Sequence, residues 1–125
     1  MLKWIDYHSV LKSYSCAHLE MLGYYPLLEI ALKDNGGKID VVGLKSSLLS
    51  IKYEKVGIEC LTNPTKQLII KKIKKYNKYF DKLFFSVFDD VSDKIIQEFG
   101  KKMFFKFPRT FFRVMHSYSN ICGKC

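Results

Sequence analysis

The chain of 125 residues carries a formal net charge of +9, with 48% hydrophobic and 26% charged residues. This length fits one domain with a single core, and the apolar content excludes a disordered chain. The positive charge favours a polyanionic partner, and nucleic acid is the first candidate, because lysine dominates the basic residues and suits phosphate contact better than base reading.

Apolar residues recur at helical spacing over residues 2–22, and Gly23 follows as a natural stop. This stretch predicts a helix, with a break expected near residues 13–15. The next apolar and aromatic run, residues 24–32, predicts a strand. The sequence Asp-Asn-Gly-Gly at 34–37 then predicts a tight hairpin into a second strand over 38–44.

Two further apolar runs, 48–53 and 56–61, predict a third strand with room for a turn at 54–55. Thr62-Asn63-Pro64 then predicts the start of a helix over 64–80, because a small polar cap followed by proline at the first helical position suits the unpaired amides. One face of this helix is apolar, and lysines occupy the rest.

The last part of the chain predicts a strand, a helix and a final strand. A short apolar strand is expected at 83–88, followed by a helix that residues 89–92 cap and Gly100 stops. Residues 103–107 read as a last strand, and 109–118 as a short helix or ordered tail.

We expect one domain over residues 1–118 and a C-terminal tail over 119–125. The tail contains Cys122 and Cys125 at the spacing of half a zinc site, but a second pair is not evident in the sequence. Unligated thiols in a tail are therefore the preferred interpretation. The side chains that could complete a site if the tail folded back are Cys16 with His18, or His116.

The N-terminus lacks the continuous apolar core of a signal peptide, and no apolar run approaches the roughly 20 residues needed to span a bilayer. A cytoplasmic protein without a membrane partner is therefore expected. Its cysteines are scattered, which favours thiols over disulfides.

Asp40 and Glu59 are the most informative residues, because each lies in a short apolar run that otherwise reads as a buried strand. An ionised carboxylate in such a run is costly unless a cation meets it. Two of them on successive strands, followed by a lysine-rich helix, indicate a divalent-metal site that faces an anionic ligand. Glu29, on the strand before, is the expected third acid, and Glu20 is a weaker candidate.

The chain resembles the PD-(D/E)xK, or restriction-endonuclease-like, nuclease superfamily over roughly residues 11–87. Within it, the resemblance is to small archaeal and viral members related to Holliday junction resolvases and RecB-type nuclease domains. It implies an α/β fold in which a helix, a three-strand meander, a helix and a strand build a central mixed sheet flanked by helices. The segments that carry it are 18–24, Glu29, 39–43, 57–60 and 80–85.

The resemblance implies metal-dependent hydrolysis of DNA, with Mg²⁺ or Mn²⁺ held by Asp40, Glu59 and Glu29. The superfamily pattern places a lysine two residues after the Glu, where this chain has Leu61. We expect Lys66 or Lys38 to supply that charge. Gln67 with Tyr76 or Tyr79 loosely fits the helix motif of RecB-type members.

Two alternatives to cleavage stay open at this stage. The first is a nuclease-fold module that has lost catalysis and binds DNA or a protein partner. The second, ranked lower, is a small zinc-dependent regulator built on the cysteines. A homodimer is one expectation, because symmetric cutting of two strands often needs two copies.

Each site residue also has a plainer interpretation. Asp40 and Glu59 could be solvated residues at strand ends or edges, and Glu29 likewise. We predict that Lys71, Lys75, Lys78 and Gln67 bind DNA, although a lysine face of a helix is often merely solvated. The neighbouring aromatic residues, Tyr76, Tyr79 and Phe80, are more often core than base-stacking platforms.

Overall fold

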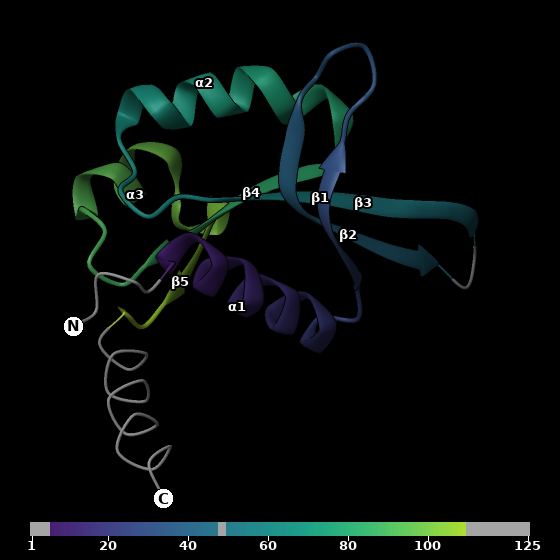
Figure 1. The fold of residues 1–125 in the computed structure, drawn as a ribbon, viewed down its shortest axis with the longest axis horizontal. Helices are drawn as coiled ribbons and strands as arrows, with labels where there is room; N and C mark the ends of the chain where they lie inside the picture. Colours follow the sequence, from purple (N-terminus) through teal and green to yellow (C-terminus); the bar gives the residue numbers. More distant parts are fainter. Residues whose placement is uncertain (1–5, 48–49, 110–125) are drawn as a thin grey trace, which may run out of the picture.

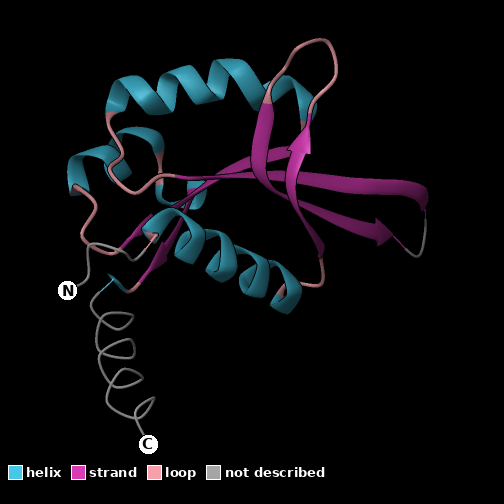
Figure 2. Ribbon diagram, in the orientation of Figure 1, coloured by secondary structure: helices cyan, strands magenta, loops and turns pink. Residues whose placement is uncertain are grey.

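A five-stranded mixed sheet with the order β1-β2-β3-β4-β5 forms the centre of the protein. The computed structural model describes residues 6–47 and 50–109. Figure 2 shows the strands crossing between helices. In chain order the elements are α1 (Tyr7–Met21), β1 (Tyr25–Ala31), β2 (Lys38–Ser47), β3 (Ser50–Cys60), α2 (Lys66–Tyr76), the 3₁₀ helix η1 (Asn77–Tyr79), β4 (Lys82–Phe88), α3 (Asp93–Phe99), the 3₁₀ helix η2 (Lys101–Met103) and β5 (Phe104–Phe107).

The sheet combines an antiparallel meander with two parallel strands. β1 pairs antiparallel with β2, and β2 antiparallel with β3. β4 then runs parallel to β3, and β5 parallel to β4. The α2 crossover between β3 and β4 is what a parallel pair requires. The expected α/β fold with a central mixed sheet flanked by helices is therefore confirmed.

Helices cover both faces of the sheet, and each face has its own apolar cluster. α1 lies on one face, and α2 and α3 lie on the other (Figure 1). Burial of these side chains is the main favourable contribution to folding, because apolar surface leaves water. The α1 cluster contains Leu11, Leu19, Val41, Val56, Ile58, Cys60 and Phe88. The α2 cluster contains Ile39, Val42, Leu61, Ile69, Tyr76, Leu83, Phe85, Val87, Ile96 and Phe104.

Two of the interruptions expected from the sequence are absent from the described residues. α1 runs without a break through residues 13–15, because the buried Ser15 hydroxyl donates to the Leu11 carbonyl at 2.7 Å and so stays satisfied inside the helix. β3 likewise runs through 54–55, where it pairs in register with β2. Both predicted breaks were wrong.

The helix after β3 begins two residues later than predicted. Thr65 is its N-cap, and the Thr65 side chain accepts from the Leu68 amide at 3.2 Å. Pro64 therefore lies before the cap rather than at the first helical position. α2 ends at Tyr76, and η1 completes the predicted span. The helix expected before Gly100 is confirmed as α3, which Gly100 ends with a φ of +95°.

The hairpin between β1 and β2 forms as the sequence predicts. Asp34 and Asn35 adopt left-handed φ values of 56° and 59°, which these two residue types tolerate. The Leu32 amide closes the turn by donating to the Gly37 carbonyl at 2.8 Å. Predictions on residues 110–118, on the tail at 119–125 and on His116, Cys122 and Cys125 lie outside the described residues.

Candidate active site

The backbone pairing of the sheet is interrupted on both sides of Asp40. The pairing of β2 with β3 begins only at Val41 and Ile58. In the pairing of β1 with β2, the residues on either side of Asp40 and Glu29 are paired, but Asp40 and Glu29 are not. Ile39 packs on the α2 face, whereas Val41 packs on the α1 face. On a regular strand two residues so spaced share a face, so β2 twists at Asp40.

The carboxylates of Asp40 and Glu59 replace the missing backbone hydrogen bonds between β2 and β3. Asp40 donates its backbone amide to Glu59 Oε1 at 3.0 Å. In return, the Cys60 amide donates to Asp40 Oδ2 at 2.8 Å. Because each acid bonds the backbone of the neighbouring strand, the strands separate at this point and both carboxyl groups reach one pocket.

Each carboxylate also contacts one basic side chain, through the second oxygen of Glu59 and through the oxygen of Asp40 that already accepts from Cys60. Lys72 Nζ lies 3.1 Å from Glu59 Oε2, and His8 Nε2 lies 3.1 Å from Asp40 Oδ2. Lys38 also lines the pocket, which has a volume of about 340 Å³. α2 and α1 therefore approach the same two acids from opposite faces of the sheet. The remaining lining residues are Cys60, Leu61, Thr62, Asn63 and Leu68.

Glu59 is buried, and its burial changes its protonation. Desolvation raises the pKa of the Glu59 carboxyl above its usual range, and the nearby Asp40 charge raises it further, while Lys72 acts in the opposite sense. A cation close to this carboxylate stabilises its ionised form, as Lys72 does in the structure.

Glu29, the expected third acid, does not line this pocket. It sits opposite Asp40 in the register, but its left-handed φ of 51° interrupts the strand. Its exposed side chain forms an ion pair with Lys12 at 3.0 Å, and this partner lowers the pKa of the Glu29 carboxyl. The structure therefore brings Asp40 and Glu59 together without Glu29.

Lys66 is not at the pocket either, because of its position around α2. It forms an ion pair with Glu98 of α3 at 2.6 Å. Six residues separate Lys66 from Lys72, which turns the two side chains about 120° apart on a helix. Lys72 therefore takes the place that the sequence suggested for Lys66. Gln67 is exposed and lies outside the pocket lining.

Lys71, Lys75 and Lys78 are exposed on α2 and η1. Lys75 and Lys78 lie over the Tyr76 and Tyr79 rings, each at 5.2 Å from the ring centroid. These lysines are placed as a phosphate-contacting surface would require, and DNA binding by them stays a prediction.

Tyr76 of α2 and Tyr79 of η1 form hydrogen bonds with the β1–β2 hairpin. The Tyr76 hydroxyl donates to the Lys38 carbonyl at 2.7 Å, and the Tyr79 hydroxyl donates to the Lys33 carbonyl at 2.9 Å. Tyr76 is buried, as the core interpretation expected. These bonds hold Lys38 beside the pocket.

Lys72 and His8 are the two pocket residues that the sequence analysis missed. A signal for Lys72 was present, because it stands between Ile69 and Ile73 at the border of the apolar face and its stem must therefore lie near the sheet. No comparable signal connects His8 to Asp40, since the contact depends on how α1 packs.

Within residues 6–47 and 50–109, no three His, Cys, Asp or Glu side chains are arranged to hold a metal ion. Magnesium commonly takes one or two carboxylates and fills its other positions with water and phosphate oxygens. Asp40 and Glu59 fall within that number, and binding of Mg²⁺ or Mn²⁺ by them stays a prediction. Cys16 and His18 lie on α1, where His18 packs against Phe105 with 4.5 Å between ring centroids.

Comparison with known proteins leaves the family open. Neither a family model nor a curated protein matches the sequence. The chain is similar to a solved protein of unknown function from Silicibacter pomeroyi, with a TM-score of 0.57 and 20% identity. The match covers 73% of this chain and 58% of that chain, so our chain spans less than two thirds of that protein. At this identity the likeness shows a shared fold alone. In the part of the chain that is described, no helix is both long and apolar enough to cross a membrane.

Proposed function

We propose that this protein is a metal-dependent DNA nuclease with a restriction-endonuclease-like fold. The observation that carries the proposal is that Asp40, Glu59 and Lys72 meet in one pocket, two acids and one lysine from three different elements. A pair of acids with an adjacent lysine is the combination that phosphodiester hydrolysis requires of this superfamily. The migrated lysine is therefore Lys72 rather than Lys66.

Each residue has a defined task in the proposed mechanism. Asp40 and Glu59 would hold Mg²⁺ or Mn²⁺, and the bound ion would lower the pKa of water and screen the scissile phosphate. Lys72 supplies positive charge to the phosphate as negative charge develops on it. Lys38 lines the same pocket and adds a second cation near the substrate. His8 orients Asp40 through the contact at Oδ2.

A module that binds DNA without cutting it is the second candidate. It is supported by Leu61, which is buried in the α2 cluster where the superfamily pattern has lysine. It is also supported by the bonds of the carboxylates, since both acids already accept from backbone amides and basic side chains. Acids with this purely structural task need only be hydrogen-bond acceptors.

Charge-removing variants distinguish these candidates. Asp40→Asn keeps an acceptor for the Cys60 amide but removes the charge that a metal ion requires. We expect Mg²⁺- or Mn²⁺-supported cleavage of single-stranded, duplex and branched DNA to fall at least 100-fold in Asp40→Asn and in Lys72→Met, an order typical of lost charge stabilisation. Lys66→Met is the matched control, and it should cut like the unaltered protein.

A rescue variant tests the assignment of the lysine. Leu61 lines the pocket two residues after Glu59, so both side chains lie on the same strand face. Adding Leu61→Lys to Lys72→Met should restore part of the lost activity. Absence of cleavage by the unaltered protein on all three substrates contradicts the nuclease proposal, and activity gained only with Leu61→Lys identifies a binding module that has lost catalysis.

A further inference from the structure

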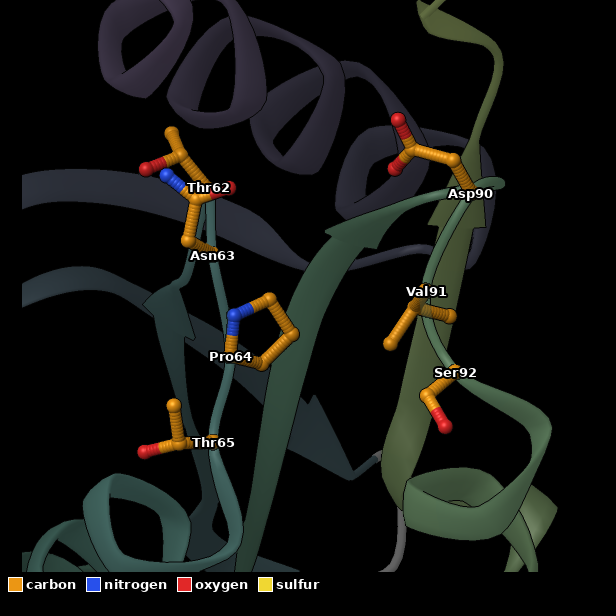
Figure 3. A pocket seen from close by; sticks show the side chains of 7 residues that line it. All are labelled: Thr62, Asn63, Pro64, Thr65, Asp90, Val91 and Ser92. Atoms are coloured by element: carbon orange, nitrogen blue, oxygen red, sulfur yellow. The ribbon is translucent and has the colours of Figure 1, made fainter.

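A second pocket opens beside the candidate active site. Its volume is about 310 Å³, and it lies between the loop before α2 and the loop before α3 (Figure 3). Thr62 and Asn63 line both pockets, so the two pockets are adjacent. One chain of nucleotides bound in the active-site pocket would therefore pass close to the second pocket.

The lining of this second pocket suits an uncharged planar group. Pro64 and Val91 face each other across it and offer apolar surfaces (Figure 3). Hydroxyl and amide groups surround these surfaces, as in pockets that read an extruded base. The polar lining residues are Thr62, Asn63, Thr65, Asp90 and Ser92.

The charge of the lining argues against a phosphate in this position. Among the described residues that line the pocket, none carries a positive charge, and Asp90 contributes a carboxylate. Because Asp90 is paired with Arg109, these residues provide no cation that is free to bind a phosphate. The active-site pocket differs, because Lys38 and Lys72 line it.

Arg109 holds the two walls of the pocket at a fixed distance. Its Nη2 donates to the Thr62 carbonyl at 3.1 Å. Its Nε lies 2.8 Å from Asp90 Oδ2, off the line of the N–H bond, so this contact is ionic. The guanidinium also stacks on Phe88, 4.1 Å from the ring centroid. Because one largely buried side chain connects both loops, the gap is formed before any ligand arrives.

We propose that this pocket binds a nucleobase next to a phosphate that Lys38 and Lys72 contact in the active-site pocket, so that the substrate is an unpaired nucleotide of a single-stranded or frayed DNA end. The proposal rests on the DNA-binding function proposed above. An intact duplex keeps its bases stacked inside the helix, whereas an unpaired base can turn into the gap between Pro64 and Val91 at little cost. Asn63 and Ser92 also line the pocket and supply polar groups near the gap.

The test measures binding without divalent ions, so that no strand is cut. The probes are a fluorescent single strand of twelve thymidines and a strand of equal length that consists only of abasic sugar-phosphate units. The filling variant is Ser92→Leu, because Ser92 is an exposed N-cap whose side chain makes no cap hydrogen bond. Ser13→Leu, the same change on an exposed serine of α1, is the matched control.

The unaltered protein should bind the thymidine strand about fivefold or more tighter than the abasic strand, from the stacking of one base. Ser92→Leu should lose that factor and bind the abasic strand normally, whereas Ser13→Leu should resemble the unaltered protein. If Ser92→Leu does not fold, Ser92→Gln carries the same expectation. Equal binding of both strands, equal weakening of both by the variant, or no binding at all overturns the inference. Cleavage in Mg²⁺, measured separately, tests the nuclease proposal.

Discussion

Replacing Glu59 with glutamine should stabilise the ion-free protein at neutral pH and remove any stabilisation by Mg²⁺. Glutamine has the shape of glutamate and keeps an oxygen for the Asp40 amide. It cannot ionise, so it avoids the cost of a buried charge. It also loses the Lys72 ion pair, but the desolvation of Glu59 is the larger effect, because the pKa of the carboxyl is raised although Lys72 lowers it.

The raised pKa of Glu59 sets the direction of the pH dependence. The folded protein binds the Glu59 proton more tightly than the unfolded chain does, because burial raises the carboxyl pKa above 4.5. The free energy of unfolding therefore decreases as pH rises from about 4.5 through the folded pKa, and is then constant. For each pH unit by which the pKa of Glu59 in the folded protein exceeds that in the unfolded chain, the free energy of unfolding at pH 7 is lower by about 1.4 kcal/mol. Glu59→Gln should lack this decrease.

Binding of Mg²⁺ should stabilise the folded form of the unaltered protein in which Glu59 is ionised. At an ion concentration of ten times Kd, binding to the folded state alone adds about 1.4 kcal/mol. For a domain of this size that raises Tm by about 5 °C. Thermal unfolding followed by circular dichroism from pH 4 to 8, with and without Mg²⁺, measures both effects. Glu98→Gln, which removes an exposed glutamate from a lysine pair, is the matched control.

Two results would refute this reasoning. If the stability of the unaltered protein rises between pH 4.5 and 7 relative to Glu59→Gln, the Lys72 pair outweighs the desolvation of Glu59. If Mg²⁺ raises Tm equally in the unaltered protein and in Glu59→Gln, the ion binds away from the acids.

Two further predictions concern α2 and η1. Replacing Lys71, Lys75 and Lys78 by glutamine should make the slope of log affinity against log salt for duplex DNA less steep by about 2.7, or about 0.9 for each lost phosphate contact. A fluorescence titration at several salt concentrations measures this slope. An unchanged slope would show that these lysines face solvent and do not contact DNA. Tyr76→Phe should lower the free energy of urea unfolding by about 1 kcal/mol, because the Lys38 carbonyl loses its donor; an unchanged stability shows that water replaces the hydroxyl. The control lysines for the first experiment, on α3 and η2, are Lys94, Lys101 and Lys102.

The sheet was largely predictable because its strands have clear local signals. β2 and β4 appear in the sequence as short apolar runs bounded by turn residues. β4 begins one residue before its expected start, whereas β2 continues three residues past its expected end, through 45–47. The predicted turn at 54–55 failed for a tertiary reason. Glu54 and Lys55 resemble a polar turn when they are considered alone, but they pair in register with β2 in the outer half of a long hairpin, where polar side chains suit a strand that faces water.

The sequence predicted the part of the site that lies on the strands, but not the lysine that the helix contributes. Asp40 and Glu59 come together because a meander places successive strands side by side, and that much follows from the order of the elements. Lys72 comes from a helix above the sheet. The buried residues Ile69 and Tyr76 show which face of α2 points inward, and they place Lys72 and Lys66 on opposite flanks of that face.

Which flank lies beside Glu59 depends on the direction of α2 across the sheet, and no local pattern in the sequence encodes that direction. A lysine on the strand, at Leu61, would have its stem in the α2 cluster and would need its charge to reach the pocket from a buried position. From α2, Lys72 reaches the same carboxylate while its side chain stays partly exposed. The cost of desolvating the lysine is therefore lower, and leucine at 61 can contribute to the core. Under the proposed nuclease function, Leu61 and Lys72 are therefore one structural solution: Leu61 provides apolar packing and α2 provides the charge.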